Sequence, residues 1–280
     1  MLSRARELAC RAALALALLV PSGASALESF WADAANAKVR LIAGGQDKNS
    51  SGFVRAGIEV RLTRGWHTYW RYAGDAGIPP RFDWTGSVNL KAAEVRWPAP
   101  TRIHVEDGIE SIGYKDAVVL PLRLHPQDPS KPIMLRLKLD LGVCEKICIP
   151  ATVNAMLEIP LGSIMPNPML LAAEARVPAP AKLGAGGKLG VLGATLKRGK
   201  EPQAVVDVAV PPNTPFDLFA EGPTDAWALP LPKRVDAKDG RARFVIPIDG
   251  APAGGSPTPS KMRLTLVAGF EAIEVTVPLD

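Results

Sequence analysis

A two-residue alternation of apolar and polar side chains is the feature that most constrains the fold of this chain. It runs through residues 55–62, 135–141 and 153–159. Successive side chains of a β-strand point to opposite faces, so each segment predicts a strand with one buried face. Short strands separated by clusters of Gly, Pro, Asn and Asp are typical of a β-sandwich. With 27 Pro and 25 Gly in 280 residues, long helices are not expected.

Residues 177–187 divide the chain into two parts. The composition of this segment, Val-Pro-Ala-Pro-Ala-Lys-Leu-Gly-Ala-Gly-Gly, predicts a linker. We therefore predict an all-β protein of two domains, a β-sandwich domain at residues 27–176 and a second, smaller β-sandwich domain at residues 188–280. Strands of the second domain are expected at residues 203–210, 241–248, 262–267 and 272–277.

One short helix is expected just before the linker. Asn167 suits the N-cap, because its side-chain oxygen can accept a hydrogen bond from an amide of the first turn. Pro168 suits the first helical position, where its missing amide hydrogen is not needed. The helix should extend to Arg176 and end before Pro178.

The first 26 residues have the pattern of a cleaved signal peptide. Three arginines precede an apolar run at residues 12–20, and Ala24-Ser25-Ala26 provides a cleavage site. The run is shorter than the roughly 20 apolar residues that a membrane-spanning helix needs. We expect Cys10 to be removed with this peptide and the mature protein to be exported to a compartment where disulfides persist. An uncleaved membrane anchor is the alternative.

The charge of the mature chain argues against nucleic-acid binding. Loss of the signal peptide removes three Arg and one Glu, so the net charge falls from +5 to +3, and no basic run is present. The chain has neither Gly-x-Gly-x-x-Gly after a strand nor Cys-x-x-Cys-His, so no cofactor is expected. His67, His104 and His125 are isolated in the sequence and are predicted to be surface or structural residues whose polar atoms are satisfied.

Two cysteines remain in the mature chain, Cys144 and Cys148, with three residues between them. The apolar positions of the strands on either side are odd-numbered, whereas both cysteines are even-numbered. Both sulfurs are therefore expected on the face of a hairpin that points away from the core, within reach of solvent. A three-residue connection also brings its flanking residues to the separation that a disulfide needs.

Three roles remain open for this pair. A redox-active disulfide is favoured. A disulfide stabilises the folded protein mainly by closing a loop of the unfolded chain, and this stabilisation is smallest for a very short loop. A structural disulfide is the second reading. A metal site is the third, but two thiolates are fewer than a tetrahedral site needs, and no His lies nearby in the sequence.

Trp-rich and Pro-rich motifs, followed by the cysteine motif, lie at residues 65–70, 74–80, 82–84, 97–100 and 143–150. Together these blocks resemble the N-terminal periplasmic domain of the DsbD family, especially its ScsB-type branch. The resemblance covers the first mature domain and implies an immunoglobulin-like β-sandwich. The C-terminal domain loosely resembles the extra domain of the longer ScsB-type proteins.

The resemblance also implies an activity, a thiol-disulfide oxidoreductase of the protein-disulfide reductase type without a cofactor. Its catalytic pair is Cys144 and Cys148, and Cys148 is the cysteine expected to form mixed disulfides. Family members accept electrons from a membrane-embedded donor, of DsbD or CcdA type, and pass them to periplasmic thioredoxin-like proteins. We expect a periplasmic protein that is a monomer.

A cap loop shields the cysteine pair in DsbD proteins. The matching stretch here is Glu110 to Tyr114, so the resemblance implies Glu110, Ile112 and Tyr114 as shielding residues. The other function class that remains is a non-catalytic periplasmic interaction or copper-stress module with a static disulfide, since ScsB-type proteins are associated with copper tolerance.

Overall fold

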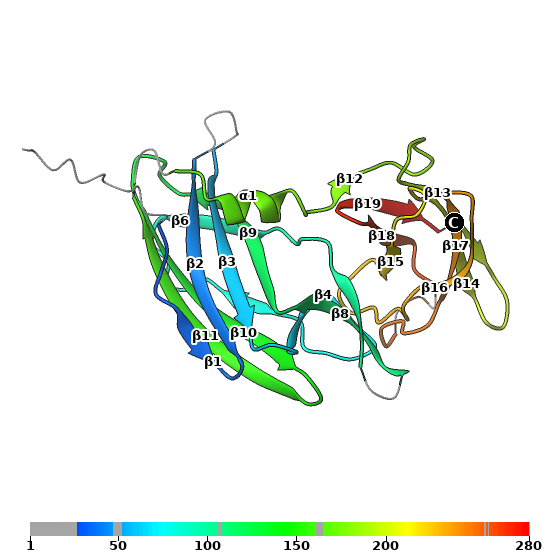
Figure 1. Ribbon diagram of the computed structural model, residues 1–280, viewed down its shortest axis with the longest axis horizontal. Helices are drawn as coiled ribbons and strands as arrows, with labels where there is room; N and C mark the ends of the chain where they lie inside the picture. The colour runs from blue at the N-terminus through cyan, green and yellow to red at the C-terminus, as the bar shows by residue number, and fades with distance from the viewer. Residues whose placement is uncertain are drawn as a thin grey trace, which may run out of the picture.

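The computed structural model describes residues 27–46, 52–105, 108–160, 165–254, 256 and 258–279. The predicted signal peptide, with Cys10, lies outside these residues. No helix in the described ranges is long and apolar enough to cross a membrane. The described chain forms two β-rich lobes joined near the short helix (Figure 1). We call the part up to α1 the first domain and the part from β12 onward the second domain.

The first domain contains two sheets. One has the order β1-β2-β3-β9-β6, and the other has the order β11-β10-β4-β8-β7, with β5 paired to β10. The strands of the first sheet are β1 (Ala32–Ala34), β2 (Ala37–Gln46), β3 (Val54–Leu62), β9 (Ala117–Pro126) and β6 (Leu90–Val95). Those of the second are β11 (Cys148–Ile159), β10 (Ile133–Cys144), β4 (His67–Gly74), β8 (Glu110–Lys115), β7 (Thr101–His104) and β5 (Arg81–Asp83).

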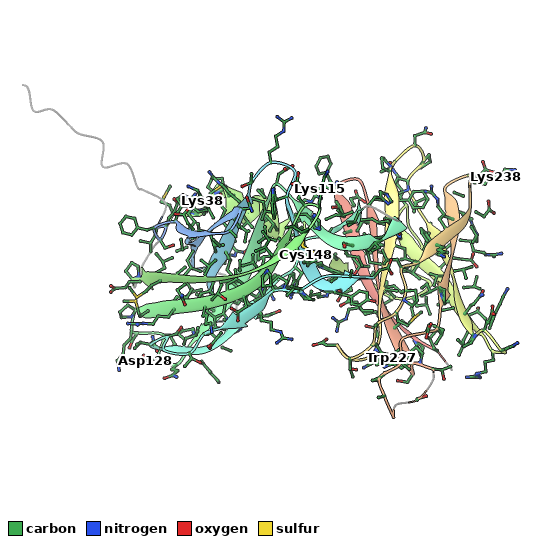
Figure 2. The ribbon with its side chains drawn as sticks, turned by 90° about the horizontal axis from the view of Figure 1, so that it is seen from below. Lys38, Lys115, Asp128, Cys148, Trp227 and Lys238 are labelled. Atoms are coloured by element: carbon green, nitrogen blue, oxygen red, sulfur yellow. A yellow bond between two sulfur atoms is a disulfide. The ribbon has the colours of Figure 1, made fainter. Side chains whose placement is uncertain are left out.

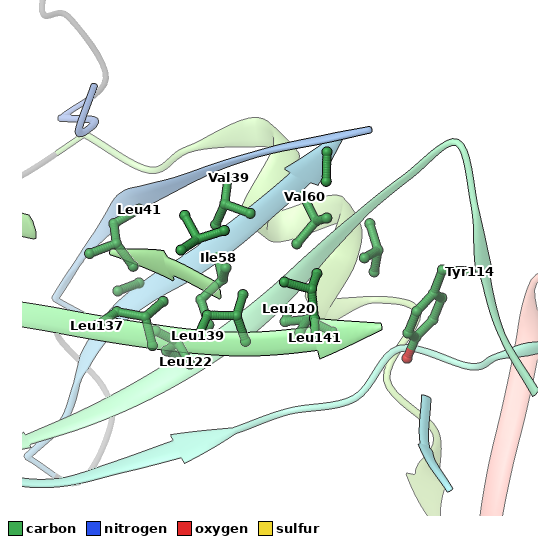
Figure 3. Packing of buried hydrophobic residues seen from close by; sticks show 14 of the residues in the cluster. Val39, Leu41, Ile58, Val60, Tyr114, Leu120, Leu122, Leu137, Leu139 and Leu141 are labelled. Atoms are coloured by element: carbon green, nitrogen blue, oxygen red, sulfur yellow. The ribbon is translucent and has the colours of Figure 1, made fainter. Parts of the chain in front are cut away.

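The core of the first domain lies between these two sheets. Alternate residues of β10, such as Leu137, Leu139 and Leu141, pack against β2, β3 and β9 (Figure 3). Of the polar residues between them, Lys138 is exposed and Asp140 is half-buried. The three alternating segments of the sequence are strands, as predicted, in β3, β10 and β11. β10 and β11 have one buried face, but the prediction of a half-buried strand is wrong for β3, where Gly57 and Glu59 on the other face are buried as well.

The predicted helix is α1 (Pro168–Glu174), two residues shorter than expected. The side chain of Asn167 accepts hydrogen bonds from the amides of Met169 and Leu170, so the predicted N-cap is confirmed. Leu170 is the buried residue of the helix. It packs beside Gly44 and Gly57, where a Cβ atom would meet the Leu170 side chain. The helix is thereby fixed on the outside of the first sheet.

The second domain also has two sheets, each with four strands. Their orders are β12-β19-β18-β15 and β13-β14-β17-β16. The strands are β12 (Ala179–Pro180), β13 (Gly190–Lys197), β14 (Gln203–Ala209), β15 (Phe216–Glu221), β16 (Lys233–Lys238), β17 (Arg241–Pro247), β18 (Lys261–Ala268) and β19 (Glu271–Pro278). A separate buried cluster, which includes Phe244, Leu264 and Val275, fills the space between them. The predicted all-β fold with a second, smaller β domain is confirmed.

The segment predicted as a linker contributes to the second domain. Ala179–Pro180 forms β12, which pairs in parallel with β19, and the amide of Ala181 donates to the carbonyl of Glu274. The two domains share no sheet among the described strands, but they are in direct contact. Phe219 and Leu231 of the second domain belong to the same buried cluster as the core of the first domain. The domain boundaries at residues 176 and 188 stay a prediction.

Candidate functional site

The predicted cysteine hairpin is present, and a disulfide closes it. β10 and β11 pair over twelve residue pairs, the last of which is Cys144 with Cys148. The two cysteines are disulfide-bonded, and their Cα atoms lie 4.2 Å apart. Val143 belongs to the core of the first domain, whereas Cys144 belongs to a separate small cluster with Tyr69 and Ala73. The sulfurs therefore lie on the face of the hairpin that points away from the core, as the alternation predicts.

The two cysteines differ in their accessibility. Cys148 is exposed, and Figure 2 places it near the middle of the long axis of the molecule. Cys144 is only 1% exposed. The expectation that both sulfurs are within reach of solvent is therefore right for Cys148 and wrong for Cys144, because another side chain covers the face that the alternation assigns to it.

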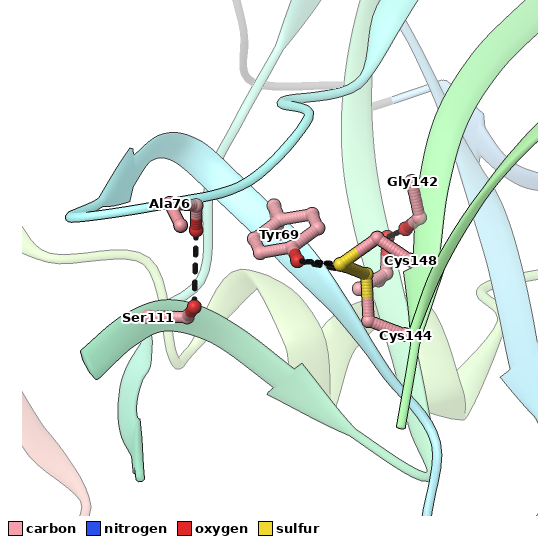
Figure 4. The surroundings of a disulfide bond; sticks show 7 residues. Tyr69, Ala76, Ser111, Gly142, Cys144 and Cys148 are labelled. Atoms are coloured by element: carbon pink, nitrogen blue, oxygen red, sulfur yellow. Dashed lines mark hydrogen bonds between the residues drawn. A yellow bond between two sulfur atoms is a disulfide. The ribbon is translucent and has the colours of Figure 1, made fainter. Parts of the chain in front are cut away.

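That side chain is Tyr69 of β4. Its Oη atom lies 2.8 Å from Sγ of Cys144 and 2.9 Å from Sγ of Cys148 (Figure 4). A disulfide carries no proton, so the phenol is the donor, and its single hydrogen is shared between the two sulfurs. Burial raises the pKa of Tyr69, and a hydrogen bond with Ser111 offsets part of this effect. The phenol therefore stays protonated at neutral pH and keeps a hydrogen-bond donor next to both sulfurs.

Two glycines make room for the Tyr69 ring. A Cβ atom at Gly142 would lie 2.9 Å from the ring, and one at Gly77 would overlap it. Gly77 also has a φ of +152°, which side chains rarely permit. The amide of Gly142 donates to the carbonyl of Ile78 over 3.3 Å. The ring is thus enclosed between β10 and residues 75–80, which we call the cover loop.

His67 lies beside the disulfide on the same strand as Tyr69. It is the register partner of Cys144, and its ring meets the Tyr69 ring edge-on at 5.5 Å between centroids. The side chain is buried, and its Nε2 atom has no hydrogen-bond partner in the described part of the chain. The prediction of a histidine with satisfied polar atoms is therefore wrong for His67. Burial first, and then the charge of Lys115, lower its pKa, so the ring is neutral at pH 7.

The lowered pKa of His67 has a consequence for stability. Below pH 6.5 the unfolded chain binds a proton at this position more readily than the folded chain does, so folding loses free energy as the pH falls. We expect the free energy of unfolding to decrease between pH 7 and pH 5, and the His67→Gln variant to show a smaller decrease. Urea denaturation across this pH range measures both.

The exposed His104 provides the control for this prediction. The His104→Gln variant keeps His67 and should keep the full decrease that His67 causes. Equal pH dependence of wild type and His67→Gln would contradict the prediction. In the structure, Nδ1 of His104 lies 2.8 Å from Oε1 of Glu110. The centroid of the His125 ring lies 6.1 Å from that of the Phe53 ring.

The structure does not bring the three expected shielding residues to the sulfurs. Ile112 and Tyr114 are buried in the core of the first domain, and the Tyr114 hydroxyl donates to the carbonyl of Pro98. Glu110 pairs with Arg102 and His104. The reason is the alternation of β8: Ser111, between Glu110 and Ile112, lies on the side of Tyr69 and donates to the carbonyl of Ala76 in the cover loop (Figure 4). Tyr69 shields the pair instead.

The arrangement can support thiol-disulfide exchange. Cys148 is exposed to an incoming thiolate, whereas Cys144 is not. Attack on one sulfur of a disulfide releases the other as a thiolate. The released sulfur would be that of Cys144, which already has the Tyr69 hydroxyl within 2.8 Å. Among the described residues, no group of three or more His, Cys, Asp or Glu is arranged to hold a metal ion.

Comparisons with known proteins agree with this geometry. Residues 38–158 match the family described as "Thiol:disulfide interchange protein DsbD, N-terminal". The chain is also similar to the crystal structure of the N-terminal periplasmic domain of ScsB from Proteus mirabilis, with a TM-score of 0.68 and 24% identity. That match covers 91% of this chain and 99% of the other, so the two share a fold over nearly their whole length. No curated protein sequence matches the chain.

Proposed function

Since residues 38–158 belong to the DsbD N-terminal family, a family of thiol-disulfide exchange, we propose that this chain relays electrons between proteins through Cys144 and Cys148. The relay would run from a membrane-embedded donor to thioredoxin-like acceptors. The relative from Proteus mirabilis is a periplasmic domain. The signal-peptide pattern at residues 1–26 supports the same location here.

The accessibility of the sulfurs suggests the order of steps. A thiolate of the donor attacks Sγ of Cys148, the bond to Cys144 breaks, and the electron pair stays on Sγ of Cys144. A second thiolate of the donor then attacks its own sulfur in the mixed disulfide, which releases Cys148 as a thiolate and leaves the donor oxidised. This chain now carries two electrons as a dithiol.

Transfer to the acceptor repeats these steps in the opposite direction. The Cys148 thiolate attacks the disulfide of the acceptor and forms a mixed disulfide. The Cys144 thiolate then attacks Sγ of Cys148, which restores the intramolecular disulfide and releases the reduced acceptor. Until this second attack, a hydrogen bond from Tyr69 stabilises the Cys144 thiolate. A hydrogen bond to an ionised sulfur is stronger than one to a neutral sulfur.

The observation that carries the proposal is the unequal exposure of two bonded sulfurs. The stabilising effect of a structural disulfide does not require one of its cysteines to be accessible. This disulfide also closes a loop of only three residues, for which the stabilisation is smallest. The alternative, a static interaction module, leaves the exposed Cys148 and the buried phenol donor without a role.

An electron-transfer assay tests the proposal. The purified protein, reduced and freed of reductant, should reduce an oxidised thioredoxin-like protein on the order of 100-fold faster than dithiothreitol at equal concentration, because docking orients the two sulfurs. Mild reduction should also leave the circular-dichroism spectrum almost unchanged. A rate no greater than that of dithiothreitol, or unfolding of the first domain on reduction, would leave only a module with a structural disulfide.

A further inference from the structure

Strand β4 connects the disulfide to the second domain. His67 and Tyr69, in its first half, lie beside the two cysteines. The next three residues, Trp70, Arg71 and Tyr72, all contact the second domain. A single strand therefore carries both the residue that covers the disulfide and the residues that hold the two domains together.

Arg71 makes the central contact between the domains. Its guanidinium donates to both carboxylate oxygens of Glu221, over 2.8 and 2.6 Å, and also to Glu274. The Arg71 side chain is 18% exposed and that of Glu221 is 14% exposed, so the pair is largely shielded from water. The guanidinium also lies over the Trp70 ring, 4.2 Å from its centroid. A paired, shielded charge of this kind is costly to leave without its partner.

The neighbours of Arg71 strengthen this contact on both sides. The Trp70 ring packs against the Phe219 ring, with centroids 6.1 Å apart. The Tyr72 hydroxyl donates to the carbonyl of Leu229. Burial raises the pKa of Tyr72 to about 12, so this donor keeps its proton. Three consecutive residues are thus fixed by the second domain.

The cover loop follows directly from this fixed part of β4. At its start, a Cβ atom on Gly74 would lie 3.0 Å from Leu231 of the second domain. Further along, Gly77 packs on the Tyr69 ring. The other side of the loop is less closely packed, because it lines a cleft of about 550 Å³ whose opposite wall is formed by residues 221–228 of the second domain. The loop has room to move if its anchored end is released.

We propose that the second domain positions the exchange site: its contacts with Trp70, Arg71 and Tyr72 hold Tyr69 and the cover loop over the disulfide, and Arg71 is the main positioning residue. The inference rests on the proposed function for its biological meaning. Its physical content, that the second domain controls access to the buried sulfur of Cys144, can be measured without any protein partner.

The test is the rate at which dithiothreitol reduces the disulfide of the folded protein. The Arg71→Met variant should be reduced about fivefold faster than wild type, since release of the cover opens Cys144 to attack in addition to the already exposed Cys148. Arg71→Lys, which keeps one ion pair, should have an intermediate rate. Iodoacetamide quenching and mass spectrometry give the rates, and thermal unfolding shows whether each variant is folded.

A second variant places the change in the other domain. Glu221→Gln removes the partner charge 150 residues away in sequence. It should accelerate reduction in the same way as Arg71→Met. Arg263 lies 3.8 Å from Glu221 and 3.9 Å from Glu274, so it can partly replace Arg71 and help the Arg71 variant to fold. If Arg71→Met does not fold, Glu221→Gln decides the question alone.

Arg243→Met is the matched control. Arg243 pairs with Asp207 entirely within the second domain, so its loss should leave the reduction rate unchanged. Folded Glu221→Gln protein with a rate within twofold of wild type would overturn the proposal. A failure of electron transfer to proteins would refute the proposed function but not this inference, because the reductant here is a small molecule.

Discussion

The Cys144→Ser variant should accumulate a mixed disulfide with a thioredoxin-like acceptor, and the Cys148→Ser variant should trap roughly tenfold less. In the first variant the exposed Cys148 still attacks the acceptor, but Cys144 is no longer present to resolve the product. In the second variant the remaining sulfur is that of Cys144, which is 1% exposed and lies under Tyr69. The acceptor disulfide cannot reach it without displacing the ring.

Non-reducing gel electrophoresis and mass spectrometry of the conjugate measure this difference. The double variant, Cys144→Ser with Cys148→Ser, is the control for adventitious crosslinking and should give no conjugate. Equal trapping by the two single variants would show that the accessibility of the sulfurs does not decide their roles. Stronger trapping through Cys144 would reverse the proposed order of steps.

The Gly113→Ala variant should lose about 3 kcal/mol or more of its free energy of unfolding. Gly113 of β8 is the register partner of Tyr69 in β4. A Cβ atom at this position would overlap the carbonyl oxygen of Thr68 and lie 3.1 Å from Cα of Tyr69. These are backbone atoms, so they cannot move aside without separating the two strands. Urea denaturation measures the loss.

The control for this variant is Gly193→Ala in β13. No atom lies within 4 Å of a Cβ built there, so the change should be nearly neutral, within about 1 kcal/mol. A stability of Gly113→Ala close to that of wild type would contradict the close approach of β4 and β8. Because the clash is next to Tyr69, the same variant should also be reduced faster by dithiothreitol.

Local pattern was sufficient to predict the hairpin and the face on which its sulfurs lie. The alternation of Leu137, Leu139 and Leu141 identifies the core face directly, and Cys144 falls on the other one. The helix was similarly predictable, because Asn167 and Pro168 act on their own first turn. Each of these inferences depends on residues close together in the sequence.

The cover over the disulfide was not predictable in this way. Tyr69 reaches the sulfurs only because β4 pairs with β10, and it is separated from Cys144 by 75 positions. The motif comparison pointed to Ile112 and Tyr114, but their place in the alternation of β8 directs them into the core. One signal was present in the sequence: Tyr69 and His67 are two positions apart, so a strand there places them on one face.

The contacts between the domains escaped sequence reasoning for the same reason. Arg71 and Glu221 are 150 positions apart, and nothing in either neighbourhood indicates its partner. The Pro- and Gly-rich composition of residues 177–187 predicted a linker, but composition cannot show that Ala179–Pro180 pairs with β19 as a strand.

The register of β10 and β11 determines what happens to the two sulfurs once they are no longer bonded. Twelve residue pairs, from Ile133 with Ile159 to Cys144 with Cys148, hold the hairpin together independently of the disulfide. Reduction therefore leaves the two thiols as cross-strand neighbours rather than as the ends of a loose loop. Their effective concentration toward each other stays high, which favours rapid ring closure over a long-lived mixed disulfide. The hairpin backbone thereby limits how long any partner remains covalently attached.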